Sequence, residues 1–155
     1  MLNPPENLAL TVLRDHYAER SNPYADCIIP TDNTLKEYLN LLRKKQFQEA
    51  VNLLAKHYEI PSPTLTINNE LPVAYIFYDF RVKTIFISPQ KIPQLWQQVP
   101  ALLLGFFNHL AEWESWTFDK EPDESRKKEK MEAEKFAQLI VRRLIDIGLN
   151  PMEMS

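Results

Sequence analysis

Residues 104–113 read Leu-Gly-Phe-Phe-Asn-His-Leu-Ala-Glu-Trp, and this stretch decides how the rest of the chain is interpreted. Its apolar residues recur at helical spacing, which predicts a central helix over residues 100–116. Residues 83–88, Lys-Thr-Ile-Phe-Ile-Ser, precede it and are typical of a strand. Residues 131–137, Met-Glu-Ala-Glu-Lys-Phe-Ala, follow it on a further predicted helix. The local order is therefore strand, central helix and second helix.

This order resembles the small zincin-like metallopeptidases of the ImmA/IrrE kind. In that family the middle helix carries H-E-x-x-H, whose two histidines bind zinc while the glutamate acts as general base. The best register places Leu104 at the first histidine, Gly105 at the glutamate and Asn108 at the second histidine. Leucine has no lone pair, glycine has no side chain, and asparagine is a poor zinc ligand. The resemblance therefore implies a zincin-like fold with no catalytic residues, no bound metal and no cofactor.

A residual site is the alternative interpretation of the same helix. His109 and Glu112 are three residues apart and share a helix face, with Trp113 beside them, and Glu132 lies on the second helix. One nitrogen and two oxygens would make a metal-dependent hydrolase with displaced ligands. The other interpretation of His109 is a histidine that is hydrogen-bonded within the protein or solvated.

Gly105 and the aromatic residues each have two interpretations. Glycine inside a helix is explained either by close packing against another element or by a small cleft where the glutamate is missing. Aromatic side chains at helical spacing are usually core, but those near the central helix exceed what one buried stripe needs. Part of that surface is then expected to meet a protein partner or a second copy of the chain. The aromatic residues are Trp96, Phe106, Phe107, Trp113, Trp116 and Phe118.

The rest of the chain predicts helices, then a small sheet, then helices. A first helix is expected over residues 5–20, with apolar Leu8, Leu10, Val12, Leu13 and Tyr17. A second helical run begins near Asp32 or Thr34, is interrupted near residues 44–46, and ends before Pro61. Strands are expected over residues 64–68, 73–80 and 83–88, a short helix over 92–98, and a long helix from Asp123 or Ser125 that Gly148 closes.

We therefore predict an α+β fold, with helices around a small, mostly antiparallel, three-stranded sheet. The chain is expected to be a single domain over residues 1–155. It divides into an N-terminal helical extension (1–46), a zincin-like core (47–147) and a tail (148–155). The central helix should pack against both the sheet and the long helix, with Leu103, Leu104, Phe107 and Leu110 mostly buried.

Composition excludes several classes of function. The net charge of −3 gives no reason to expect nucleic-acid binding, and no apolar run reaches the roughly 18 residues of a membrane span. With no visible secretory signal, we expect a cytoplasmic protein. The single cysteine, Cys27, forms no internal disulfide, and two glycines cannot supply a Gly-x-Gly-x-x-Gly loop.

Three hypotheses about function follow from the sequence. The first is a catalytically inactive zincin-like protein that acts as a binding, regulatory or assembly module. The second is the metal-dependent hydrolase that uses His109, Glu112 and Glu132. The third is an unrelated α+β domain whose aromatic helix mediates protein–protein interaction.

Overall fold

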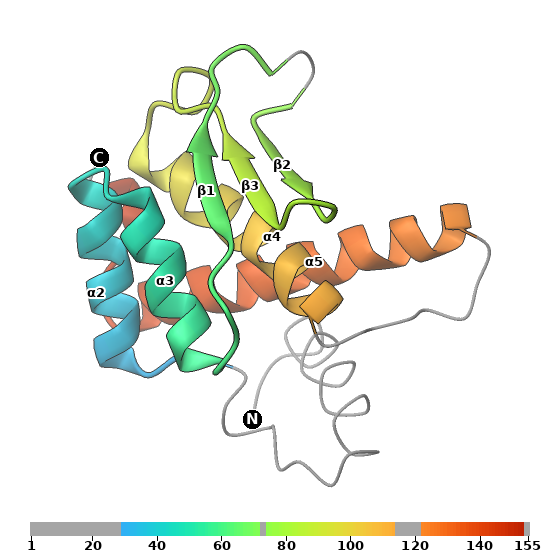
Figure 1. Cartoon of the computed structure of the whole chain (residues 1–155). Coiled ribbons are helices and arrows are strands. Elements are labelled where there is room, and N and C mark those ends of the chain that lie inside the picture. Colours follow the sequence, from blue (N-terminus) through green and yellow to red (C-terminus); the bar gives the residue numbers. More distant parts are fainter. Residues whose placement is uncertain (1–28, 72–73, 114–121, 154–155) are drawn as a thin grey trace, which may run out of the picture.

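The computed structural model describes residues 29–71, 74–113 and 122–153 (Figure 1). Of Glu112, Trp113 and residues 122–129, it describes the backbone alone. The expected helix over residues 5–20, Cys27, Trp116 and Phe118 lie outside the described residues. The elements in chain order are α2 (Asp32–Arg43), α3 (Phe47–His57), β1 (Thr64–Ile67), β2 (Ile76–Asp79), β3 (Thr84–Ile87), α4 (Leu95–Trp113), α5 (Pro122–Asp146) and the 3-10 turn η2 (Pro151–Glu153). The predicted α+β class is confirmed.

The three strands form a mixed sheet in the order β1-β3-β2. Strand β3 pairs with β1 in parallel and with β2 in antiparallel orientation. The expectation of a mostly antiparallel sheet was therefore wrong. The physical reason is that β2, although it runs antiparallel to β1, does not pair with it, because β3 lies between the two strands. Strand β3 lies at the centre and is the most buried of the three, with Ile85 and Ile87 fully covered.

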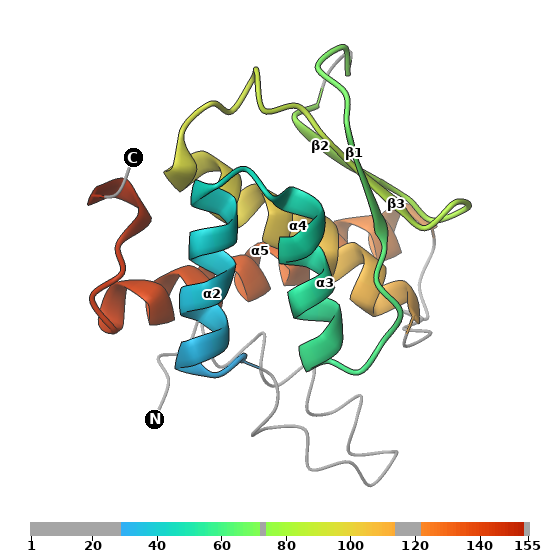
Figure 2. The ribbon, with the colours of Figure 1, turned by 60° about the vertical axis from the view of Figure 1, so that its left-hand side comes forward.

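The helices gather on one side of the sheet (Figures 1 and 2). Helix α4 contacts β2 and β3 on one side and α5 on the other, as predicted for the central helix. Leu103, Phe107 and Leu110 are at most 1% exposed, which confirms their predicted burial. Leu104, the fourth of these residues, is less completely buried than the other three and packs against the edge of the same core. It lies on the side of α4 that neither the sheet nor the core covers completely.

Helix α2 belongs to the same hydrophobic core as the later elements. Tyr38 is fully buried, and its hydroxyl donates a hydrogen bond to the backbone oxygen of Val99 on α4 (2.9 Å). The N-cap of α2 is Thr31 rather than the expected Asp32 or Thr34, and its side chain accepts a hydrogen bond from the amide of Thr34. The described part of the expected extension is thus integrated into the fold.

The predicted interruption after α2 is present, because Lys45 has a φ of 61° and the chain turns there between α2 and α3. The same kind of local signal ends α5. Gly148 has a φ of 82°, its amide donates to the oxygen of Ile145, and the amide of Leu149 donates to that of Leu144. This is a Schellman motif, which favours glycine at that position.

Helix α4 begins earlier than predicted. It starts at Leu95 and runs through Pro100, so the expected short helix over residues 92–98 merges with it. Proline inside a helix removes a hydrogen bond and costs about 3 kcal/mol. Leu95 and Val99 are buried in the core on the N-terminal side of Pro100, and this burial offsets the cost. No helix in the described ranges has an apolar stretch long enough to cross a membrane.

Candidate functional site

Helix α4 carries the three positions that the resemblance assigns to the metal site. Leu104 and Asn108 are one turn apart on the same face, and both are partly buried. Gly105 is buried on the adjacent face. Of these three residues, only Asn108 has a side-chain oxygen or nitrogen, so the face does not offer a pair of ligands.

Gly105 lies where α4 packs closely against the sheet. A Cβ atom at this position would lie 2.9 Å from Cγ2 of Ile85 on β3 and 3.2 Å from Cγ1 of Ile76 on β2. The first distance is shorter than real Cβ contacts allow. Of the two interpretations of Gly105, the geometry therefore supports close packing. Two isoleucine side chains take the space beside the position that would carry the glutamate.

His109 is buried, with 2% of its surface exposed, and both of its ring nitrogens are hydrogen-bonded. Nε2 lies 2.8 Å from the backbone oxygen of Pro61, and Nδ1 lies 3.0 Å from the hydroxyl oxygen of Tyr78 on β2. A carbonyl oxygen only accepts, so Nε2 carries the proton and donates it to Pro61. The neutral ring then accepts the Tyr78 hydroxyl at Nδ1. The imidazole thus links α4, β2 and the loop that leads into β1.

The environment of His109 keeps this ring neutral. Burial lowers its pKa below the ordinary value of 6.5, and the positive charge of Lys83 lowers the pKa further, against the opposing effect of the hydrogen bond to Pro61. A neutral imidazole binds metals through its free lone pair. In His109 that lone pair is on Nδ1 and accepts the hydrogen bond from Tyr78.

Of the other residues of the alternative metal site, the structure describes the side chain of Glu132 alone, and the hydrogen-bond partners of the His109 nitrogens are Tyr78 and Pro61 instead. Glu132 is buried on α5, and its Oε1 lies 3.7 Å from Nζ of Lys135 on the same helix. Glu112 and Trp113 form the end of α4, where only the backbone is described. Among the side chains that the structure describes, no three His, Cys, Asp or Glu residues gather closely enough to hold a metal ion.

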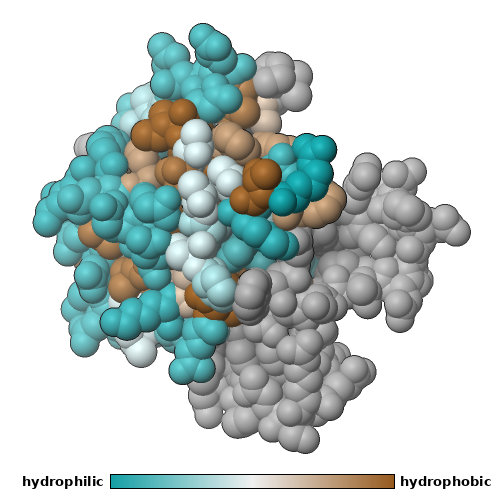
Figure 3. Space-filling model, in the orientation of Figure 1, coloured by the Kyte–Doolittle hydropathy of each residue, from teal (hydrophilic) through white to brown (hydrophobic). Residues whose placement is uncertain are grey.

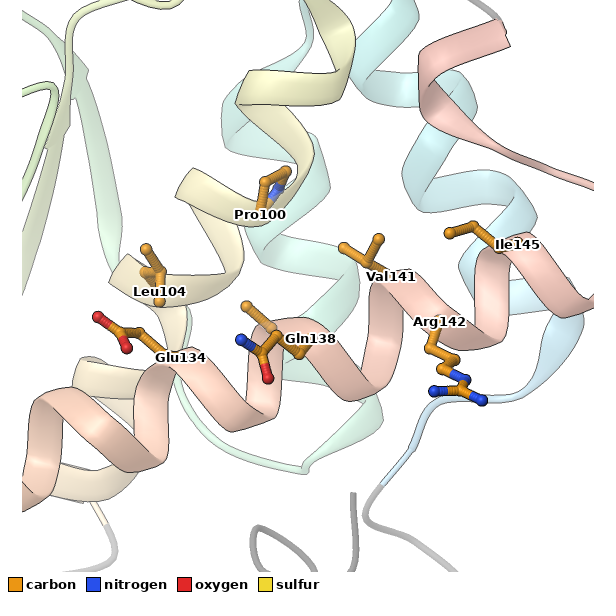
Figure 4. A pocket seen from close by; sticks show the side chains of 8 residues that line it. Pro100, Leu104, Glu134, Gln138, Val141, Arg142 and Ile145 are labelled. Atoms are coloured by element: carbon orange, nitrogen blue, oxygen red, sulfur yellow. The ribbon is translucent and has the colours of Figure 1, made fainter. Parts of the chain in front are cut away.

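A groove between α4 and α5 borders one of the assigned positions, Leu104. Its volume is about 390 Å³, within the roughly 300–1,000 Å³ typical of ligand pockets. Leu104 and Pro100 border it on α4, and Val141 and Ile145 border it on α5 (Figure 4). The full lining is Pro100, Leu104, Glu134, Ala137, Gln138, Val141, Arg142 and Ile145.

The groove has an apolar floor and charged ends. Glu134 lies at one end and Arg142 at the other, with Gln138 between them on α5 (Figure 4). Ile145 is 48% exposed although it is a large aliphatic residue. Such a groove can take a segment with an apolar face. The opposite charges at the two ends of the groove would fix the direction in which that segment lies.

Sequence reasoning missed this groove, although one signal for it was present. The apolar residues that recur at helical spacing along the long helix, and so predict its buried face, are Phe136, Leu139, Ile140, Leu144 and Ile147. Val141 and Ile145 form a further apolar pair at i, i+4, beside that face. This extra width indicates a second contact surface. Its partner on α4 depends on how the two helices pack, and the sequence does not show this.

The outer face of the sheet is a second surface with exposed apolar residues. Phe77 on β2 is 48% exposed and stacks on Phe86 of β3, with ring centroids 6.2 Å apart. Phe80 and Val82 are exposed in the turn between these strands. The face that carries the strands shows hydrophobic residues in separate patches between hydrophilic ones (Figure 3). Scattered exposed apolar residues of this kind are normal on soluble surfaces.

Comparison of the chain with protein-family models, curated proteins and solved structures found no significant match.

Proposed function

We propose that this chain is a catalytically inactive zincin-like protein that acts as a binding module, and that the α4–α5 groove receives an apolar helical segment of a partner protein. Leu104 carries the proposal. The position that the resemblance assigns to the first zinc ligand holds a leucine, and this leucine lines the apolar groove. A position suited to coordination chemistry thus carries a side chain suited to hydrophobic contact.

The arrangement around α4 supports the loss of catalysis. Peptidase chemistry of the H-E-x-x-H kind needs two imidazoles, a general base and a water on the metal. Gly105 supplies no base, and its Cα lies too close to Ile85 to tolerate a side chain without movement. His109 is the nearest imidazole in the sequence, and it is turned toward Pro61 and Tyr78.

The dimensions of the groove support a helical ligand. The lining residues on α5 run from Glu134 to Ile145, which corresponds to about 16 Å along a helix. An amphipathic helix binds such a groove through anchors at i, i+3 or i+4, and i+7. Three anchors of this kind extend over about 11 Å, which fits within the groove.

A peptide selection on the full-length protein tests the binding role. The probe is a displayed library of peptides of about 15 residues with apolar residues at i, i+3 and i+7. We expect binders in the micromolar range that Ile145→Asp weakens by about tenfold or more, because the charge enters the apolar part of the groove. The matched control is Ile67→Asp on β1, because Ile67 is 54% exposed and lies outside the groove. It should leave the affinity unchanged.

Two outcomes contradict the binding role. One is a library that yields no binder whose affinity depends on Ile145. The other is a parent protein that elutes as a dimer and that Ile145→Asp converts to a monomer, which would show that a second copy fills the groove. Thermal melts of both variants establish that the folded protein is being compared.

Metal analysis tests the inactive state. After dialysis against trace zinc, we expect the full-length protein to retain much less than one zinc per chain. Elemental analysis gives the ratio. One tightly held zinc per chain would refute the proposal in favour of the displaced-ligand hydrolase. In that case His109→Gln and Glu132→Gln should each release the metal.

A further inference from the structure

The α4–α5 groove carries its charge on one of its two walls. Glu134 and Arg142, both exposed on α5, are the charged members of its lining. The α4 wall consists of Pro100 and Leu104, which are uncharged. The two charges are eight positions apart on α5, which corresponds to about 12 Å along a helix. Gln138 lies midway between them and both donates and accepts hydrogen bonds, so it favours neither direction of a bound segment.

The residues that follow the two charged lining residues on α5 have partners within the fold. Nζ of Lys135 lies 3.7 Å from Oε1 of Glu132. The guanidinium of Arg143 donates two hydrogen bonds to the carboxylate of Asp32, at 3.0 and 3.1 Å. Salt screens exposed charges beyond about 8 Å, so the nearest charges decide what a bound segment meets. Such a segment therefore meets a negative end and a positive end.

Two arrangements of a bound helix match both ends of the groove. A helix with acidic first turns and basic last turns matches them when it lies antiparallel to α5. A helix with the reverse order matches them when it lies parallel to α5. The first helix is stabilised by its own macrodipole, which favours acidic residues at the N-terminus and basic residues at the C-terminus, whereas the second is destabilised by it. The antiparallel arrangement is thus favoured both by the groove and within the ligand.

We propose that the α4–α5 groove binds an amphipathic helix of a partner protein that begins with acidic residues and ends with basic ones. This helix lies antiparallel to α5, with its acidic end at Arg142 and its basic end at Glu134. The inference rests on the proposed function, because it names the partner of the same groove. Exposed ion pairs contribute little affinity. The apolar contacts to Leu104, Val141 and Ile145 therefore hold the partner, and the two charges set its direction.

Disulfide capture of one peptide by the full-length protein tests the direction. The probe is a peptide of about 12 residues, blocked at both ends, with leucines at i, i+3, i+4 and i+7. This set of leucines reads the same in both directions, so the apolar face favours neither. Glutamates lie on both sides of the leucine face in the first half, and lysines do so in the second half. One form of the peptide carries a cysteine at its N-terminus, and another carries it at its C-terminus.

The protein carries a single cysteine at one end of the groove or at the other. With the native cysteine removed as Cys27→Ser, Ile145→Cys places a thiol near Arg142, and Met131→Cys places one near Glu134. Ile145 and Met131 are similarly exposed, at 48% and 53%. We expect the peptide with the N-terminal cysteine to react at least about fivefold faster at position 145 than at position 131. The peptide with the C-terminal cysteine should show the reverse order, and both preferences should fade in 1 M salt.

Reversal of the two groove charges is the next comparison. Glu134→Lys with Arg142→Glu leaves the net charge unchanged and should invert the preferred end for both peptides. The matched control is Glu49→Lys with Lys56→Glu, which reverses two exposed charges on α3 outside the lining. It should keep the preference of the parent. A peptide with glutamine in place of its glutamates and lysines should react equally at both ends, and thermal melts check that all variants fold.

The outcomes separate this inference from the proposed function. Equal rates at both ends, the opposite preference, or a preference that survives the charge reversal would refute the direction and leave the binding role in place. Absence of any peptide binding that depends on Ile145 would overturn both. Disulfide-linked protein dimers of the Ile145→Cys variant that excess peptide does not suppress would overturn the inference in favour of a second copy in the groove.

Discussion

The imidazole of His109 connects three segments of the chain through its two ring nitrogens. Nε2 donates to Pro61, 48 residues earlier in the sequence, and Nδ1 accepts from Tyr78, 31 residues earlier. A residue type that often binds metal is thus satisfied by a backbone oxygen and a hydroxyl. Its buried position makes the protonated form unfavourable, so its role depends on pH.

We predict that His109 makes the protein less stable in mild acid. Its folded pKa is lowered by burial, whereas the unfolded chain has the ordinary value of 6.5. Below about pH 6.5 the unfolded state therefore binds a proton that the folded state does not, and the free energy of unfolding falls as pH falls. The stabilisation is complete above pH 6.5 and is lost through the folded pKa. Each pKa unit of lowering corresponds to about 1.4 kcal/mol.

Urea unfolding of the parent and His109→Gln between pH 7.5 and 5 measures this effect. Glutamine is always neutral and can donate to Pro61, so the variant should lose less stability over this interval. Carboxylates common to both proteins cancel in the difference between them. Parallel curves for the two proteins would show that His109 does not contribute to the acid sensitivity.

Helix α4 packs closely against the sheet at Gly105. Gly105 faces Ile85 on β3 and Ile76 on β2, and the two isoleucines leave no space for a Cβ atom. The same helix continues through Pro100 because its first turns are buried. In both places the packing between elements overrides the local preference of the residue.

We predict that Gly105→Ala destabilises the protein. In an open helix position this exchange would stabilise by about 1 kcal/mol. Here the added methyl group meets Cγ2 of Ile85, and overpacking of a core costs about 1–3 kcal/mol. The net loss should be about 1 kcal/mol, measured by chemical unfolding.

A double-mutant cycle with Ile85→Ala is the control for Gly105→Ala. Ile85→Ala alone should cost about 2–5 kcal/mol, because it leaves a cavity. The double variant should be more stable than the sum of the two single losses, because the alanine at 105 enters the freed space. A more stable Gly105→Ala protein would contradict the close approach.

At the scale of the whole molecule, the groove results from the way that α4 and α5 pack. Leu104 and Val141 are 37 positions apart in the sequence and line the same hollow. The ion pair between Asp32 and Arg143 brings the start of the described chain to the end of the same helix. The proposed ligand surface is thus set by contacts between distant parts of the chain.

The sequence by itself determined the α+β class and most of the helices and strands. Helical periodicity identified α2, α3, α4 and α5. The interruption at Lys44–Gln46 and the glycine at 148 marked where α2 and α5 end, because a helix end depends on a few neighbouring residues. The sequence also shows directly that Leu104 and Gly105 have no ligand group and that Asn108 offers only an amide. The resemblance to zincins that assigns these positions to the H-E-x-x-H motif stays a prediction.

Only the tertiary structure decided which elements meet. The parallel pairing of β1 with β3 depends on where β3 enters the sheet, and strand patterns do not encode this order. The same holds for the close approach at Gly105, for the two partners of His109, and for the exposure of Leu104 in the groove. Each depends on distances between residues far apart in the sequence, and such distances are fixed only when the whole core packs.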